Sequence, residues 1–152
     1  MKANKEIIRQ VGRIYDWLDE QLIIAQNTLA GVCDVSRKGH QTACGKCCDF
    51  QMYDHRLYVT TPEMLFFIDK LGVENIKEMA GGRCPYQMNT KCTVHPYRFA
   101  GCRIFCCKAD PAFQSVLTEA VIKKFKTICD EFQIPYRYVD LPTALKDFLT
   151  TG

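Results

Sequence analysis

The sequence predicts a mainly α-helical fold in which helices wrap around a cysteine-rich metal core that includes a small irregular β-hairpin. Two segments, 5–30 and 110–150, carry apolar residues at helical spacing. The segment 44–107 between them carries eight of the ten cysteines. Because 152 residues is the size of one domain, we expect a single domain over 1–152 with its metal core at 44–107.

The first predicted helix spans residues 5–30. Its apolar positions recur every three or four residues and are Ile7, Val11, Ile14, Leu18, Leu22, Ala25 and Leu29. This spacing is typical of one helix face. We expect the face to pack against the core of the domain, with a dimer seam as the alternative. Gly31 is expected to end the helix.

A short strand and a second helix are predicted next. Residues 57–59 are apolar and β-prone, which favours a strand. Thr60 with Glu63 forms a capping box, while Thr61-Pro62 offers a competing start with proline at the first helical position. The helix is expected to end at Gly72.

A short helix over 74–80 and a hairpin over 84–95 are predicted to follow. The hairpin would turn at 88–91, which leaves Cys84 and Cys92 near its two ends. A hairpin brings cysteines that are distant in sequence side by side, as a shared metal requires.

Two further helices are predicted after the cysteine-rich segment. Asp110-Pro111 is a helix start with a carboxylate cap and proline at the first position. The apolar face continues to Phe132, and Pro135 is expected to stop the helix. Residues 136–139 are predicted to be extended and 141–149 to form the last helix.

The cysteines of the segment 44–107 are candidate metal ligands. They are Cys44, Cys47, Cys48, Cys84, Cys92, Cys102, Cys106 and Cys107. A C-x-x-C motif and two adjacent pairs indicate metal binding more than packing. Isolated thiols pack as small buried hydrophobes, and we expect this of Cys33 and Cys129. Structural disulfides are the alternative, which a reducing compartment disfavours.

Zinc and iron–sulfur clusters both bind thiolates. A tetrahedral zinc site typically uses two short cysteine knuckles, for which Cys44 with Cys47 and Cys102 with Cys106 have the spacing. Neighbouring side chains leave an extended backbone in opposite directions, so adjacent cysteines suit a unit of several irons better than one zinc. The pattern therefore narrowly favours a 4Fe–4S cluster over zinc.

Four basic residues lie close to these cysteines in the sequence, namely Lys46, Arg98, Arg103 and Lys108. We expect Arg98 and Arg103 to contact the cofactor, by donating hydrogen bonds to sulfur or by balancing negative charge. Solvated surface positions are the alternative for all four. His40 and His95 are candidate imidazole ligands, with ordinary loop residues as the alternative.

The overall charge gives little support to a nucleic-acid partner. The formal charge of +3 counts every thiol as neutral, and eight thiolates with two zinc ions would change it to −1. No apolar run is long enough to cross a membrane, and the first residues do not resemble a signal peptide. We therefore expect a cytoplasmic protein without a membrane partner.

These motifs resemble the YkgJ-type cysteine-cluster proteins, which are described as zinc- or iron-chelating domains and are related to flagellin lysine N-methylase. The resemblance covers 44–105 through CGKCC, the Cys84-Pro85 step and C-x(9)-C-R, with a similar tail at 132–138. It implies that the following positions match the family pattern: Cys44, Cys47, Cys48, Cys84, Cys92, Cys102, Arg98 and Arg103.

The sequence also departs from the family pattern. Gln41 stands where the family has a further cysteine, His95 replaces a tyrosine, and Cys106 replaces a proline. We infer that Cys106 or Cys107, or else His95, supplies the missing ligand.

Three functions follow as expectations. The first is a metal-binding protein without turnover. The alternative implied by the resemblance is a metal-dependent protein-lysine methyltransferase, although a G-x-G-x-x-G motif for the methyl donor is missing from the sequence. The second alternative is a structural zinc protein that mediates interactions with a protein partner. A zinc-ribbon nucleic-acid module is disfavoured because no basic helix face is predicted.

Overall fold

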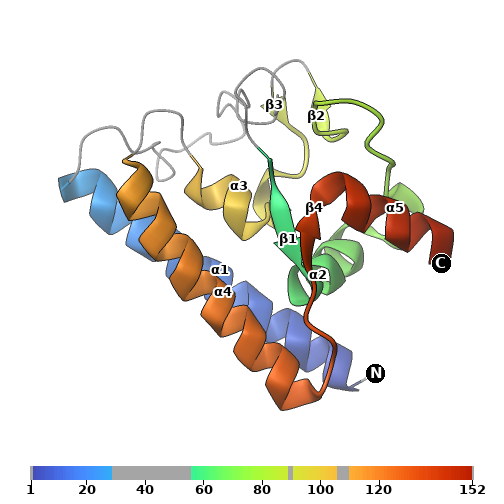
Figure 1. Ribbon diagram of the computed structural model, residues 1–152, viewed down its shortest axis with the longest axis horizontal. Coiled ribbons are helices and arrows are strands. Elements are labelled where there is room, and N and C mark those ends of the chain that lie inside the picture. Colours follow the sequence, from blue (N-terminus) through green and yellow to red (C-terminus); the bar gives the residue numbers. More distant parts are fainter. Residues whose placement is uncertain (1, 29–55, 89–90, 106–109, 152) are drawn as a thin grey trace.

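The computed structural model describes residues 2–28, 56–88, 91–105 and 110–151. Its α-helices are α1 (Lys2–Thr28), α2 (Thr61–Leu71), α3 (Ala100–Ile104), α4 (Pro111–Phe132) and α5 (Leu141–Thr151), shown in Figure 1. Two short 3-10 helices are η3 (Val73–Asn75) and η4 (His95–Tyr97). The prediction of a mainly helical fold is therefore confirmed. A cysteine-rich metal core is not visible in these ranges.

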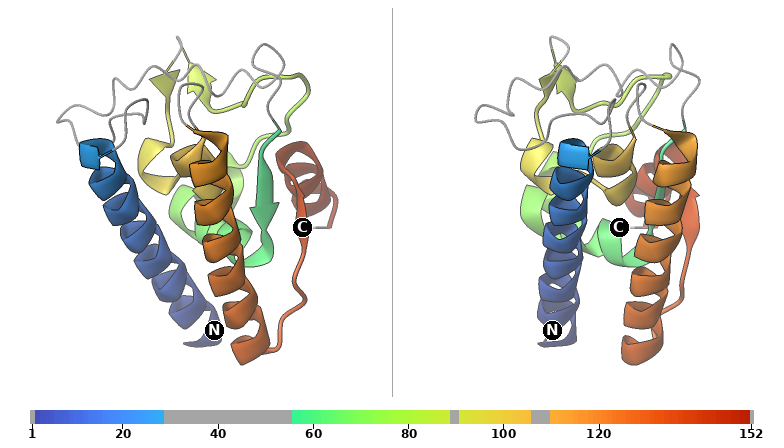
Figure 2. Two further views of the ribbon diagram at one scale, coloured as in Figure 1. Left: turned by 60° about the vertical axis from the view of Figure 1, so that its left-hand side comes forward. Right: turned by 90° about the vertical axis from the view of Figure 1, so that its left-hand side faces the viewer.

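The helices α1 and α4 lie side by side and run in opposite directions, with α2 and α3 packed against them (Figures 1 and 2). The predicted apolar face of α1 is buried at Ile7, Val11, Leu18, Leu22 and Ala25. This face packs inside the chain, as the sequence pattern predicts. Tyr15, which the pattern does not select, is buried with it.

Two small antiparallel ribbons complete the fold. β1 (Tyr58–Thr60) pairs with β4 (Tyr138–Asp140), with Val59 opposite Val139. β2 (Gln87–Met88) pairs with β3 (Lys91–Cys92), with Gln87 opposite Cys92, which confirms the predicted hairpin. The two extended segments at β1 and β4 were also expected, but nothing in the sequence predicted that they pair.

The hydrophobic residues form two clusters. The α1–α4 cluster is made of Ile7, Val11, Tyr15, Leu18, Leu22, Phe66, Ala100, Ile104, Leu117, Val121, Phe125 and Ile128. The α2–α5 cluster is made of Leu57, Val59, Phe67, Ile76, Met79, Tyr86, Val94, Phe99, Leu141, Ala144 and Leu145. α3 contributes to the first cluster and, through Cys102, packs against the second. It therefore lies where the two clusters meet.

The helix ends follow the predicted capping signals. Thr60 is the N-cap of α2 and forms the capping box with Glu63, so the competing start at Thr61 is wrong. Asp110 caps α4 by accepting a hydrogen bond from the Ala112 backbone N–H. α2 ends before Gly72. The φ of Gly72 is 92°, a conformation that glycine adopts readily and residues with a Cβ rarely adopt.

The short helix predicted over 74–80 is wrong. Only the 3-10 turn η3 forms, and the chain then continues without helix or strand to Gly82. The Lys77 N–H donates to the Tyr86 hydroxyl at 2.8 Å, a tertiary bond that a local helix would compete with. Ile76 and Met79 are buried in the α2–α5 cluster from this irregular backbone. Tertiary packing therefore outweighs the weak local helix preference.

Candidate metal centre

Three of the predicted ligand cysteines lie in the described part of the chain. Cys84 precedes the hairpin, Cys92 is on β3 and Cys102 is on α3. None of the three forms a disulfide with another described cysteine, and all three are half-buried and pack against the α2–α5 cluster. The fold thus brings three thiols from three different elements or turns to the border of one apolar cluster.

These three thiols do not form a metal site by themselves. In the described ranges, no group of three or more Cys, His, Asp or Glu side chains lies close enough to hold an ion. The hairpin ladder pairs Cys92 with Gln87, whereas Cys84 lies in the turn before it and accepts the Gln87 N–H at its carbonyl. The two cysteines are therefore not opposite one another on the ladder.

Ten other residues that the sequence analysis discusses lie outside the described residues. They are the candidate ligands His40, Cys44, Cys47, Cys48, Cys106 and Cys107, the basic residues Lys46 and Lys108, and Cys33 and Gln41, which are not expected to be ligands. The elements next to these positions, however, are described. The C-terminal end of α1 and the N-terminal end of α4 lie at the same end of the molecule as the hairpin (Figures 1 and 2).

Arg103 is a buried residue that ties three parts of the chain together. Its guanidinium donates to Asp19 Oδ2 at 2.7 Å, to the Arg98 carbonyl at 2.8 Å and to the Pro96 carbonyl at 3.1 Å. The guanidinium also lies 4.2 Å from the centre of the Tyr15 ring. Arg103 therefore fixes α3 against α1 and against the turn at η4.

Arg98 interacts electrostatically with Arg103 and with two of the candidate ligands. Its Nε donates to the His95 carbonyl at 3.0 Å. Burial lowers the pKa of Arg98, and the neighbouring charge of Arg103 lowers it further, while Cys102, Asp19 and Cys92 act in the opposite direction. The Arg98 guanidinium is thus close enough to both thiols to interact with them electrostatically.

Within the part of the chain that the structure describes, the charges around these thiols are unbalanced. Within the described ranges, Asp19 is the one carboxylate bonded to this pair of arginines. Its Oδ1 is buried without a hydrogen-bond partner there. Among the described residues, Arg98 and Arg103 therefore carry one more positive charge than Asp19 balances, and Cys92 and Cys102 interact electrostatically with Arg98.

His95 and Cys129 are the other sequence candidates that the structure describes. His95 opens η4, is half-buried, and belongs to no metal-holding group in the described ranges. Cys129 is on the buried face of α4 with 2% of its surface exposed, and burial raises the pKa of its thiol. The expectation that Cys129 is a core residue is confirmed.

Sequence reasoning identified Glu63 only as a capping residue, whereas the structure gives it a larger role. Its Oε1 accepts hydrogen bonds from the Tyr15 hydroxyl at 3.1 Å and from the Ala100 N–H at 2.7 Å. Its Oε2 accepts from the Thr60 N–H at 2.9 Å and from the Thr60 hydroxyl at 3.0 Å. One buried carboxylate thus joins α1, α2 and the start of α3, the helix that carries Cys102.

The burial of Glu63 has an electrostatic consequence. Desolvation raises the pKa of the Glu63 carboxyl, and its four hydrogen bonds act in the opposite direction. Burial and the Glu63 charge raise the pKa of Tyr15 well above its ordinary value. A glutamate that satisfies a capping box and follows a proline gives no sequence signal for such burial.

Comparison with protein-family models, curated proteins and solved structures finds no match to this chain. The resemblance to the cysteine-cluster family therefore stays a prediction. None of the described helices combines the length and the apolar character needed to cross a membrane.

Proposed function

We propose that this chain binds a thiolate-coordinated metal centre, with a 4Fe–4S cluster narrowly favoured over zinc. The proposed ligands come from Cys44, Cys47, Cys48, Cys84, Cys92 and Cys102, followed by Cys106 and Cys107. The observation that carries the proposal is the arginine pair, Arg98 and Arg103, next to Cys92 and Cys102.

The excess positive charge fits the needs of such a centre. A divalent ion with four thiolates carries net negative charge, and so does a four-iron cluster with four cysteine ligands. Burying that charge is costly unless opposite charge lies close by. Arg98 is suited to supply it, because Asp19 compensates only one of the two guanidinium groups among the described residues.

The surroundings of the described thiols also support a shielded centre. Cys84, Cys92 and Cys102 are half-buried against the cluster that contains Phe99 and Tyr86. Hydrogen bonds to sulfur and exposure to solvent both set the potential of an iron–sulfur cluster. We assign Arg98 the role of charge partner, and Arg103 the role of holding α3 and η4 in place.

The proposal is tested by the metal content of the protein purified without oxygen. We expect iron and acid-labile sulfide in comparable amounts. Stoichiometric zinc without sulfide would show that the centre is a zinc site. Cys102→Ser should lose most of the bound metal. Its matched control, Cys129→Ser, replaces a thiol of the hydrophobic core and should keep it. Absence of both metals, or equal loss in the two variants, would overturn the proposal.

The methyltransferase alternative rests on the resemblance alone. No contact among the described residues favours it over metal binding without turnover. No contact among the described residues favours a structural zinc protein that binds a protein partner either. Stoichiometric zinc without sulfide in the experiment above would favour that function.

A further inference from the structure

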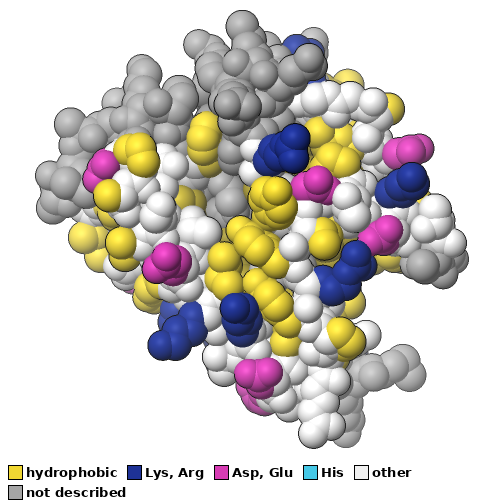
Figure 3. Space-filling view, in the orientation of Figure 1, with side chains coloured by type: hydrophobic (Ala, Val, Ile, Leu, Met, Phe, Trp, Pro, Cys, Tyr) yellow, Lys and Arg dark blue, Asp and Glu magenta, His cyan; other side chains and the backbone are white. Residues whose placement is uncertain are grey.

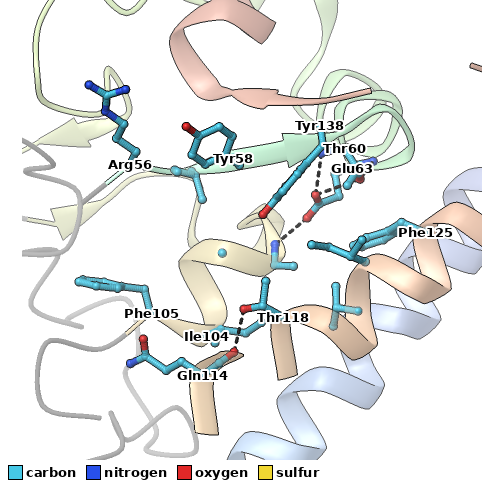
Figure 4. A pocket seen from close by; sticks show the side chains of 15 residues that line it. Arg56, Tyr58, Thr60, Glu63, Ile104, Phe105, Gln114, Thr118, Phe125 and Tyr138 are labelled. Carbon is cyan, nitrogen blue, oxygen red and sulfur yellow. Dashed lines mark hydrogen bonds between the residues drawn. The ribbon is translucent and has the colours of Figure 1, made fainter. Parts of the chain in front are cut away.

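A second candidate site lies on a different side of α3. An open pocket of about 190 Å³ is lined by residues of β1, α3, α4 and β4 and by their neighbours in the chain (Figure 4). Its apolar wall is formed mainly by Leu57, Ile104, Val121, Ile122 and Phe125. Hydrophobic side chains gather on this face of the molecule, between α4 and the paired strands (Figure 3). No described cysteine lines the pocket.

Two tyrosines form part of the pocket wall at the paired strands. The rings of Tyr58 and Tyr138 lie 5.3 Å apart, and the two residues keep 40% and 41% of their surfaces exposed. Exposed aromatic side chains beside an apolar hollow are typical of binding sites. Gly101 lets α3 pack closely against Leu57, the residue before β1, because a Cβ at Gly101 would lie only 2.4 Å from Leu57 Cδ1.

The volume limits the ligand to a small molecule. An apolar protein cavity of about 150 Å³ is large enough to bind benzene. The pocket of about 190 Å³ therefore suits one six-membered ring with a small substituent. A nucleotide or a peptide would not fit inside it.

The polar groups of the pocket are mostly engaged. Each oxygen of Glu63 already accepts two hydrogen bonds from the protein. The Thr118 hydroxyl donates to the Gln114 carbonyl at 2.8 Å. The Tyr138 hydroxyl points into the pocket in Figure 4, and burial and the Glu63 charge raise its pKa, so it stays a neutral donor. Tyr138 is thus the group best placed to bond a ligand.

The pocket offers no partner for a charged ligand among the described residues that line it. Arg56 lies at its edge and is exposed, so water screens its charge. The Glu63 carboxylate disfavours an anion nearby, and its oxygens are already bonded, so an ammonium group would find no partner there. We propose that the pocket binds a small neutral ring compound with one hydroxyl group, which hydrogen-bonds to Tyr138.

The first test titrates the full chain, labelled with ¹⁵N, with phenol and follows the backbone amide signals. Saturable shifts are expected at β1, α3 and β4. Benzoate and benzylamine have the same ring but carry a charge, and they should bind at least about tenfold more weakly, because burying an unpaired charge is costly. Shifts that do not saturate, or equal binding of the charged compounds, would overturn the proposal.

The hydroxyl contact is tested by Tyr138→Phe, which removes one oxygen and keeps the ring. Phenol binding should weaken about two- to tenfold, the effect of one hydrogen bond, while toluene binding should not change. Tyr58→Phe is the matched control, because the Tyr58 hydroxyl points away from the pocket in Figure 4. Equal effects of the two variants on phenol would contradict the assigned contact.

Filling the pocket gives an independent test. Thr118→Phe places a ring in the hollow and should abolish phenol binding. Thr127→Phe is the control on the same helix, because the Thr127 hydroxyl also bonds the carbonyl four residues before it, at 3.0 Å, but the residue is exposed outside the pocket. Binding that survives Thr118→Phe in a folded protein would show that phenol binds elsewhere.

Discussion

Two buried charged residues, Glu63 and Arg103, hold the helix that carries Cys102. Glu63 bonds the Ala100 N–H at the start of α3, and Arg103 anchors α3 to Asp19 of α1. Since buried charged groups are tolerated only when they are hydrogen-bonded, these contacts specify the position of α3 closely. These hydrogen bonds fix the position of Cys102, one of the candidate ligands, independently of a metal.

Replacing Glu63 by glutamine should destabilise the protein at every pH. Both carboxylate oxygens accept a backbone N–H, so the glutamine amino group must face one of the two donors. One unsatisfied buried donor costs about 1–3 kcal/mol in the free energy of unfolding. Urea unfolding of Glu63→Gln measures this, with the exposed Glu119→Gln as the control, for which little change is expected.

The advantage of Glu63 over glutamine should also depend on pH. Burial raises the pKa of the Glu63 carboxyl in the fold above its ordinary value, so folding favours the protonated carboxyl. The stability that this group contributes is therefore complete below about pH 4.5 and decreases as the pH rises through the pKa in the folded state. The difference in unfolding free energy between wild type and Glu63→Gln should shrink from acid to neutral pH. A difference that grows with pH would contradict the assignment.

Arg103→Lys should cost much more stability than the same change at Arg137. Both arginines bond an aspartate at 2.7 Å, but the Arg103 side chain is 6% exposed and that of Arg137 is 53% exposed. Lysine keeps the charge and loses the planar fork that reaches two backbone carbonyls. We expect a loss of about 1–3 kcal/mol for Arg103→Lys and at most about 1 kcal/mol for Arg137→Lys. Thermal unfolding of both variants measures these losses. Equal losses of stability would contradict the role given to Arg103.

At the scale of elements, α4 ends in a conformation that the sequence does not favour. Gln133 follows Phe132 in the left-handed region with φ of 53°, where glycine is favoured over other residues. Gln133→Gly should therefore raise the unfolding free energy by about 0.5–1 kcal/mol. Glycine at Thr127, inside the helix, should lower it by about 1 kcal/mol. Chemical unfolding of both variants tests this contrast in sign.

Sequence reasoning succeeded where a local signal and the tertiary structure agree. The faces of α1 and α4 are long and periodic, and the Thr60 and Asp110 caps are made by neighbouring residues. The helix predicted over 74–80 is wrong because the Lys77 N–H donates its hydrogen bond to the hydroxyl of Tyr86, nine residues further along the chain. The pairing of β1 with β4 and the contact of Tyr15 with Glu63 also join distant segments, so no local pattern announces them.

The sequence predicted the candidate ligands of the site but not the charged residues around them. Spacing identified Cys84, Cys92 and Cys102, and the structure brings them to one apolar cluster. The charge balance at Arg98 depends on Asp19 in α1, which is remote in sequence, so no local pattern indicates it. The pocket beside Tyr138 is formed by four separate elements, and its existence follows only from their packing.

For the whole molecule, the two hydrophobic clusters should respond differently to loss of the metal. The α1–α4 cluster contains none of the candidate ligands, whereas the α2–α5 cluster packs against Cys84, Cys92 and Cys102. Binding energy of a thiolate site contributes directly to the stability of the structure around it. Hydrogen exchange of metal-free protein should therefore accelerate at the hairpin and α3 and change little in the middle of α1 and α4. Uniform acceleration, or none, would contradict this division.

The central claim is that thiolates of this chain bind a metal, and X-ray absorption at the metal edge of anaerobically purified protein tests it most directly. We predict a first shell of sulfur at about 2.3 Å from the metal, with additional iron–iron scattering if the centre is a cluster. The signal should be lost in Cys102→Ser and kept in Cys129→Ser. A first shell of nitrogen and oxygen alone, or protein without stoichiometric metal, would contradict the account.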